Sequence, residues 1–144
     1  GARRPLSGVR YLLDTNICIH LRGRRQPAVL RRFETLEDGD VGLSVITYGE
    51  LVYGAEHSSQ RERAIAGIRE ILNLVPILDL PTKAAEFYGV FRATLAAQGS
   101  IIGNNDLWIA AHAHAAGLIL VTNNEREFRR IPELKIENWA ADPA

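Results

Sequence analysis

Short apolar runs alternate with longer helical stripes along most of the chain. Five runs predict buried strands, because each is rich in branched apolar residues and is bounded by turn-forming residues. They are residues 9–13, 41–45, 75–80, 118–121 and 135–139. Between them, apolar side chains recur at helical spacing, which predicts helices at 16–21, 27–36, 47–57, after Ser58 or Ser59, at 82–98 and at 106–116. This alternation predicts an α/β fold with a parallel central sheet of about five strands and helices on both faces.

The pattern continues without a linker, an internal repeat or a low-complexity tract. At 144 residues and 47% hydrophobic content, the chain is long enough to bury a sizeable core. We therefore expect one domain over residues 9–140. Residues 1–8 carry no periodic pattern, and we expect them to be a tag remnant or a disordered tail.

Composition narrows the expected environment of the protein. No apolar run approaches the roughly 18 to 20 residues that cross a bilayer, so no membrane association is expected. Cys18 is the single cysteine, which excludes an internal disulfide and fits a reducing compartment. We expect a cytoplasmic protein in which Cys18 is a packed core thiol.

Three acidic residues follow predicted strands. Asp14 comes after Leu13, Glu50 follows the second strand in Tyr48-Gly49-Glu50, and Asp106 stands at the start of a predicted helix. Ligands of open α/β sheets bind at the carboxyl edge of the strands, where residues far apart in sequence meet. Carboxylates gathered there repel each other unless a cation lies among them. The pattern predicts a divalent metal site with Asp14, Asp106 and Glu50 as candidate ligands and Mg²⁺ or Mn²⁺ as the ion.

Each acid also has a purely structural explanation. Asp14 can cap the helix that follows it, and Thr47-x-x-Glu50 matches a capping box. Asp106 can be a first-turn acid favoured by the helix dipole. These explanations treat the acids one at a time, whereas their common position at strand ends favours a shared function.

Two further candidates follow the fourth predicted strand in Thr122-Asn123-Asn124. Asn124 has a side-chain carbonyl that can ligate a hard cation or hold a metal-bound water. Thr122 can orient a water or a carboxylate through its hydroxyl. Glu125 and Glu127, in the next turn, are expected to point to solvent.

Four segments together resemble the PIN-domain nucleases, and specifically the VapC toxins of bacterial toxin–antitoxin pairs. In chain order they are Leu13-Asp14-Thr15-Asn16, Tyr48-Gly49-Glu50-Leu51, Gly103-Asn104-Asn105-Asp106-Leu107-Trp108-Ile109-Ala110 and Val121-Thr122-Asn123-Asn124-x-x-Glu127-Phe128. The resemblance implies a metal-dependent endoribonuclease that cuts RNA, with tRNA as the suspected target. It makes Asp14, Glu50 and Asp106 the three central acids. Asn124 stands where many relatives have a fourth acid, which argues against a second tightly held ion.

The resemblance also implies roles and partners. Asp14 and Asp106 are expected to ligate the metal directly, and Glu50 to orient or deprotonate the attacking water. A cognate VapB-type antitoxin is expected to lay a helix into a groove between residues 51–55 and 65–72. A homodimer, and a hetero-oligomer with the antitoxin, are expected as well.

Other functions remain as alternatives. The more serious one is a catalytically weak or inactive PIN domain that binds RNA or a partner, and the neutral Asn124 is its support. A phosphatase with an aspartyl-phosphate intermediate fits poorly, because its second acid would be expected at the position of Asn16.

Packing is the main expectation for several other polar and aromatic residues. His112 and His114 are two residues apart on one predicted helix and cannot pair on a metal, so packing is expected for both. Trp108 is expected in the core, with base stacking as the alternative. Two groups of arginines predict either solvated helix faces or phosphate contacts; they are Arg22, Arg24, Arg25, Arg31 and Arg32, and Arg126, Arg129 and Arg130.

Overall fold

The computed structural model describes residues 8–23, 26–37 and 39–140, and within them five parallel strands form one sheet. The strands are β1 (Tyr11–Leu13), β2 (Val41–Ser44), β3 (Ile77–Leu78), β4 (Ile119–Val121) and β5 (Ile136–Glu137). Their order across the sheet is β3-β2-β1-β4-β5, so β1 is the central strand. The predicted α/β fold with a parallel sheet is confirmed.

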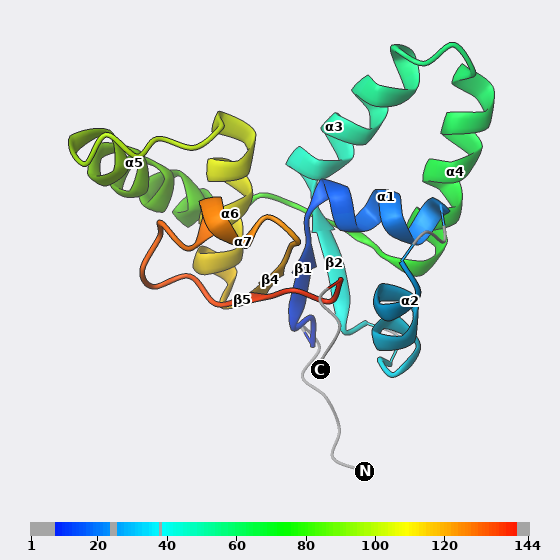
Figure 1. The fold of residues 1–144 in the computed structure, drawn as a ribbon, viewed down its shortest axis with the longest axis horizontal. Coiled ribbons are helices and arrows are strands. Elements are labelled where there is room, and N and C mark those ends of the chain that lie inside the picture. Colours follow the sequence, from blue (N-terminus) through cyan, green and yellow to red (C-terminus); the bar gives the residue numbers. More distant parts are fainter. Residues whose placement is uncertain (1–7, 24–25, 38, 141–144) are drawn as a thin grey trace.

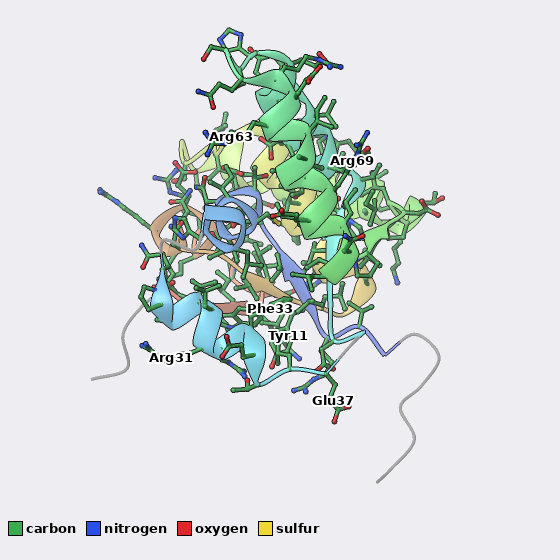
Figure 2. All side chains as sticks on the ribbon, turned by 90° about the vertical axis from the view of Figure 1, so that its right-hand side faces the viewer. Tyr11, Arg31, Phe33, Glu37, Arg63 and Arg69 are labelled. Atoms are coloured by element: carbon green, nitrogen blue, oxygen red, sulfur yellow. The ribbon has the colours of Figure 1, made fainter. Side chains whose placement is uncertain are left out.

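Helices cover both faces of this sheet, as predicted. They are α1 (Thr15–Gly23), α2 (Pro27–Glu34), α3 (Val45–Glu56), α4 (Arg61–Leu74), α5 (Thr82–Ala97), α6 (Asn104–Ala116) and α7 (Glu125–Phe128). In Figure 1, α5, α6 and α7 lie on one side of the strands, and α1, α2 and α4 lie on the other. Figure 2 views the second side, with Arg63 and Arg69 along α4 and Arg31 on α2. Residues 1–7 of the predicted tail lie outside the described residues, so that prediction stays open.

Strand β1 supplies both hydrophobic cores because successive side chains of a strand point to opposite faces. Leu12 is fully buried in a cluster with Leu120 and Phe128 on the α5–α6 face. Leu13 is fully buried in a second cluster with Leu43 on the opposite face. The sheet is therefore held from both sides, and its carboxyl edge is fixed in position.

Glycine is required at two points of this framework. A Cβ on Gly42 of β2 would lie 2.7 Å from the side chain of Leu78 in β3, so a larger residue would displace that neighbour. Gly117 ends α6 with φ of 69°, in the left-handed region that favours glycine. Its turn leads the chain directly from α6 into β4.

Ser44 starts α3, and this differs from the sequence prediction. Its Oγ accepts a hydrogen bond from the backbone N–H of Ile46 at 3.1 Å and lies 2.9 Å from Nδ1 of His112. The predicted capping box is wrong: the helix begins at Val45, so Thr47 lies buried in the first turn and cannot be the N-cap. Ser44, the last residue of β2, provides the cap directly after the buried Leu43.

The helix predicted to begin after Ser58 or Ser59 is capped by neither serine. Helix α4 begins at Arg61 with Gln60 as its N-cap residue, and Ser58 instead accepts a hydrogen bond from the Gln60 N–H at 3.0 Å. Ser58 therefore stabilises the turn before the helix.

Replacing Ser44 with alanine is expected to lower the free energy of unfolding by about 1 to 3 kcal/mol, because it removes a helix cap and leaves the buried His112 nitrogen without its partner. Urea denaturation measures this change. Ser58→Ala is the control, because it removes a hydroxyl that accepts one backbone N–H in a turn and contacts no buried imidazole, and it is expected to cost less than about 1 kcal/mol. Equal losses in the two variants would contradict the role of the Ser44–His112 contact.

Candidate active site

Asp14 lies at the carboxyl end of β1 and is only 4% exposed. Its Oδ1 accepts a hydrogen bond from the backbone N–H of Ile17 at 3.0 Å, so it caps α1 as the structural explanation proposed. The hydroxyl of Thr122, at the end of the neighbouring β4, also donates to this carboxylate. The Asp14 side chain therefore caps α1 and also belongs to the group of carboxylates at this edge of the sheet.

Glu50 reaches the same edge from the second turn of α3. Its Oε1 accepts a hydrogen bond from the hydroxyl of Thr15, the residue that directly follows Asp14. Its Oε2 lies 3.5 Å from the side-chain amide of Asn105 in the first turn of α6. Glu50 is thus held between α1, which follows Asp14, and α6, which carries Asp106. Thr15 and Asn105 were not among the predicted site residues.

Asp106 lies in the first turn of α6, as expected, and is half-buried. The pKa of Asp106 is raised to about 6, first by burial and then by the negative charges of Glu50, Glu127 and Asp14 in that order. The pKa of Asp14 is also raised to about 6: burial is the largest cause, the hydrogen bonds from Thr122 and Ile17 oppose it, and the charge of Glu50 adds to it. The structure therefore brings the three predicted acids into one electrostatically coupled group.

Thr122 and Asn124 lie at this edge but act through other residues. Thr122 is fully buried, and its Oγ1 accepts a hydrogen bond from the backbone N–H of Asn124 at 2.9 Å. The side-chain amide of Asn124 donates to Oε2 of Glu127 at 3.1 Å. Thr122 therefore holds Asp14, and Asn124 holds Glu127.

Glu127 corrects the prediction that both glutamates of this turn point to solvent. Its side chain is half-buried, is bound by Asn124 and raises the pKa of Asp106 through its charge. The cause is local: α7 buries Phe128 in the core, which anchors the short helix against the sheet edge. Glu125 instead accepts hydrogen bonds from Arg129 and Asn138. We call Asp14, Glu50, Asp106 and Glu127 the acid site.

An open cleft of about 560 Å³ lies beside the acid site. It is lined by Glu50, Thr15 and Asn105, together with Val45, Ile46, Gly49 and Tyr53 of α3. A ligand entering this cleft meets the Glu50 carboxylate directly. Among the described residues, no three acid, histidine or cysteine side chains are close enough together to enclose a single ion.

The remaining candidates are structural. Cys18 is buried, and burial raises the pKa of its thiol well above the usual range, so it is the packed thiol that was predicted. His112 contacts Ser44 in the core, and His114 packs edge-on against Phe87 with ring centroids 4.4 Å apart. The core position predicted for Trp108 is wrong: its ring is half-buried and stacks on Tyr88.

The described arginines of the two predicted groups are mainly engaged in intramolecular contacts. Arg32 bonds the Tyr11 hydroxyl and Glu137, and Arg129 pairs with Glu125 at 2.7 Å. Arg130 donates to the carbonyl of Ile101. Arg24 and Arg25 lie outside the described residues. Phosphate contacts by these groups therefore stay a prediction.

Comparison with known proteins agrees with this arrangement of acids on a parallel sheet. The PIN domain profile matches residues 11–134 of the chain. The chain belongs to the PIN-domain family. This PIN domain is 48% identical over 131 residues to Ribonuclease VapC2 of Haemophilus influenzae, an alignment that covers 91% of this chain and 98% of the relative. Within the family it therefore belongs to the VapC ribonucleases.

Two further relatives extend this result. The PIN domain is 42% identical over 132 residues to the tRNA(fMet)-specific endonuclease VapC of Shigella flexneri, with 92% of this chain and 99% of the relative covered. A crystal structure of DNA-bound VapBC from Salmonella typhimurium contains a chain that matches with a TM-score of 0.85 and 40% identity, covering 91% of this chain and 98% of that chain. In the described part of this PIN domain, no helix is both long and apolar enough to span a bilayer.

The raised pKa of Asp14 predicts a pH-dependent effect of Asp14→Asn in the presence of a chelator. Burial favours the protonated acid, so its stabilisation is complete below about pH 4 and is lost as the pH rises through about 6. The asparagine has no charge to bury. The variant is therefore expected to be more stable than the wild type at pH 8, by up to about 3 kcal/mol, and similar to it at pH 4.

Denaturation curves at pH 4, 6 and 8 measure this difference. Asp79→Asn is the matched control, because Asp79 is exposed and lies outside the acid site. Parallel stability profiles of the wild type and Asp14→Asn across this pH range would contradict the burial of an ionised Asp14.

Proposed function

We propose that this chain is the toxin of a toxin–antitoxin pair and hydrolyses RNA phosphodiesters as a divalent-metal-dependent endoribonuclease. The observation that carries the proposal is the group of four acids in which the charges of Glu50, Glu127 and Asp14 act on Asp106, with Glu50 lining an open cleft. The relatives named ribonuclease and tRNA(fMet)-specific endonuclease support the same activity.

The chemistry of the acid site fits a hard divalent cation. All four acids offer oxygen ligands, and burial first, then neighbouring negative charge, raises the pKa values of Asp14 and Asp106. Mg²⁺ uses one or two carboxylates and keeps several waters, so Asp14 and Asp106 would hold it, and Mn²⁺ would bind the same ligands. When bound, the ion supplies Lewis-acid stabilisation of the phosphate and a more acidic water.

The residues around the proposed metal ion have separate roles in the reaction. Glu50, held by Thr15 and Asn105, orients a water in the cleft and accepts its proton as the water oxygen bonds to phosphorus. The ester P–O bond breaks, and the leaving oxygen takes a proton from solvent. Thr122 fixes the orientation of the Asp14 carboxylate. Asn124 fixes Glu127, which adds the fourth negative charge next to Asp106.

We propose transfer RNA as the substrate class. The Shigella flexneri relative, at 42% identity over nearly the whole chain, is a tRNA(fMet)-specific endonuclease. The cleft beside Glu50 is open to solvent, so a looped strand of a folded RNA can reach the carboxylates without being threaded through the protein.

We also propose a VapB-type antitoxin as partner, since related solved structures are VapBC complexes. The groove predicted for its helix, between residues 51–55 and 65–72, stays a prediction, and Leu51, Ala55, Ile68 and Ile71 are buried in one hydrophobic cluster there. A hollow of about 470 Å³ is a second candidate position, lined by residues of α1 and α4 that include Gly23, Ala64 and Gly67. Small side chains there allow a helix to approach closely. The predicted homodimer remains a prediction.

The alternative of an inactive binding module loses its support in this geometry. That reading depended on the neutral Asn124, and Glu127 supplies the acid that Asn124 lacks.

Conservative neutralisation of the acid site is expected to abolish RNA cleavage without unfolding the protein. Asp14→Asn, Glu50→Gln, Asp106→Asn and Glu127→Gln each keep a hydrogen-bond acceptor but remove a charge. We expect cleavage to fall by about 100-fold or more for Asp14, Glu50 and Asp106, and by about 10- to 100-fold for Glu127, which lies behind Asn124. Cleavage of purified tRNA is measured with Mg²⁺, with Mn²⁺ and with a chelator.

Glu125→Gln is the control, because it removes a carboxylate from the same short helix but outside the acid site. It is expected to cut like the wild type. Undiminished cleavage in chelator would refute the metal dependence, and equal effects of Glu125→Gln and Glu127→Gln would refute the fourth acid.

A further inference from the structure

Four side chains of α5 and α6 form a linked cluster next to the acid site. The α5–α6 cluster is Tyr88, Arg92, Asn104 and Trp108. The rings of Tyr88 and Trp108 stack with centroids 3.9 Å apart and planes 11° apart. The Tyr88 hydroxyl donates to Oδ1 of Asn104 at 3.3 Å, and Nη1 of Arg92 donates to the Tyr88 hydroxyl at 2.7 Å. The guanidinium of Arg92 is therefore tied to a rigid aromatic pair.

The hydrogen bonds connect this cluster to the acid site. Asn104 is the first residue of α6, and Asp106 follows in the same turn. Asn105, between them, reaches Glu50 with its side-chain amide. Arg92 is thus linked to the start of α6 through Tyr88 alone, on the side of the acid site where α5 lies.

Arg92 carries a positive charge that no carboxylate neutralises within the described part of the chain. The exposed Arg61 and Arg129 each lie 2.7 Å from a glutamate, and Arg32 lies 3.5 Å from Glu137. Arg92 is exposed, and its hydrogen bond goes to a neutral hydroxyl. Its remaining N–H groups are therefore available to an anionic ligand.

Electrostatic repulsion opposes the approach of an RNA strand to this site. Its phosphates must come close to four carboxylates, and a metal ion compensates only the phosphate that it touches. A phosphate one position along the strand needs a cation from the protein. A guanidinium is suited to this role because it presents several N–H donors in a fixed plane to phosphate oxygens.

We propose that Arg92 binds a backbone phosphate of the RNA next to the scissile one, and that Tyr88 is the positioning residue that holds the guanidinium there. The inference rests on the proposed ribonuclease function and deepens it. Trp108 covers one face of the Tyr88 ring, so the cluster presents charge rather than an open stacking surface. The contact therefore recognises the RNA backbone and not a particular base.

Kinetics and binding together test this assignment. Arg92→Ala is expected to raise KM for tRNA by about tenfold while kcat stays within about threefold of the wild type, since a charged hydrogen bond outside the reacting atoms is lost. The slope of log affinity against log salt concentration is expected to become shallower by about 0.7 to 1, the contribution of one phosphate contact. Tyr88→Phe is expected to change both quantities in the same direction but by less.

Matched variants separate charge from structure. Arg69→Ala removes an exposed arginine from α4, on the opposite side of the molecule (Figure 2), and is expected to match the wild type. Arg92→Gln keeps a donor for the Tyr88 hydroxyl without the charge and is expected to behave like Arg92→Ala. Arg92→Lys keeps the charge and is expected to recover part of the affinity.

Binding of a fluorescently labelled tRNA, measured by anisotropy in the Asp14→Asn background, makes the test independent of cleavage. If the wild type does not cut RNA, the proposed function fails, while the binding comparison still decides the role of Arg92. The inference is overturned if Arg92→Ala binds with the affinity and salt slope of Arg69→Ala, or if Arg92→Gln binds like the wild type.

Discussion

Repulsion among four partly buried carboxylates is the constraint around which this molecule is built. Asp14, Glu50, Asp106 and Glu127 come from four different elements that end or begin at the carboxyl edge of one parallel sheet. Burial first, and neighbouring negative charge second, raises the pKa of Asp14 and Asp106 to about 6, so above that pH the folded chain keeps negative charge where burial disfavours it. Two hydrophobic cores, one on each face of β1, provide the favourable folding free energy that offsets the cost of burying these acids.

Neutral hydrogen-bond donors keep the acids in place without compensating their charge. Thr122 holds Asp14, Thr15 holds Glu50 and Asn124 holds Glu127. Behind them, Ser44 and His112 join the start of α3 to the middle of α6, the two helices that carry Glu50 and Asp106. The acids are therefore oriented before any cation or phosphate arrives, which is what electrostatic catalysis requires. In the proposed function, Arg92 adds the cation that the rest of the RNA backbone needs.

The sequence predicted the sheet, its helical layers and three of the four acids. Asp14 directly follows β1 and Glu50 lies close behind β2, but the expectation of a strand before Asp106 was wrong, because a loop after α5 leads into α6. Glu127 and Arg92, two other side chains for which a role is proposed, were not identified. The orientation of Glu127 depends on Phe128, whose burial anchors α7. The one local signal was the Asn124-x-x-Glu127 spacing, which allows the side-chain amide of Asn124 to donate a hydrogen bond to Glu127. Arg92 lies in the middle of a long helix, and only the packing of α5 on α6 brings it to the site. Such tertiary placements leave no local pattern.

A pH titration of the side-chain carboxyl carbons by nuclear magnetic resonance, on metal-free protein, tests the coupled acid site most directly. Asp14 and Asp106 are expected to titrate with pKa values of about 6 instead of the usual 3.8. Addition of Mg²⁺ is expected to lower both, because a cation favours the ionised form. If both groups titrate near 4 in the metal-free protein and do not respond to Mg²⁺, the carboxylates are not crowded into one site and the account is wrong.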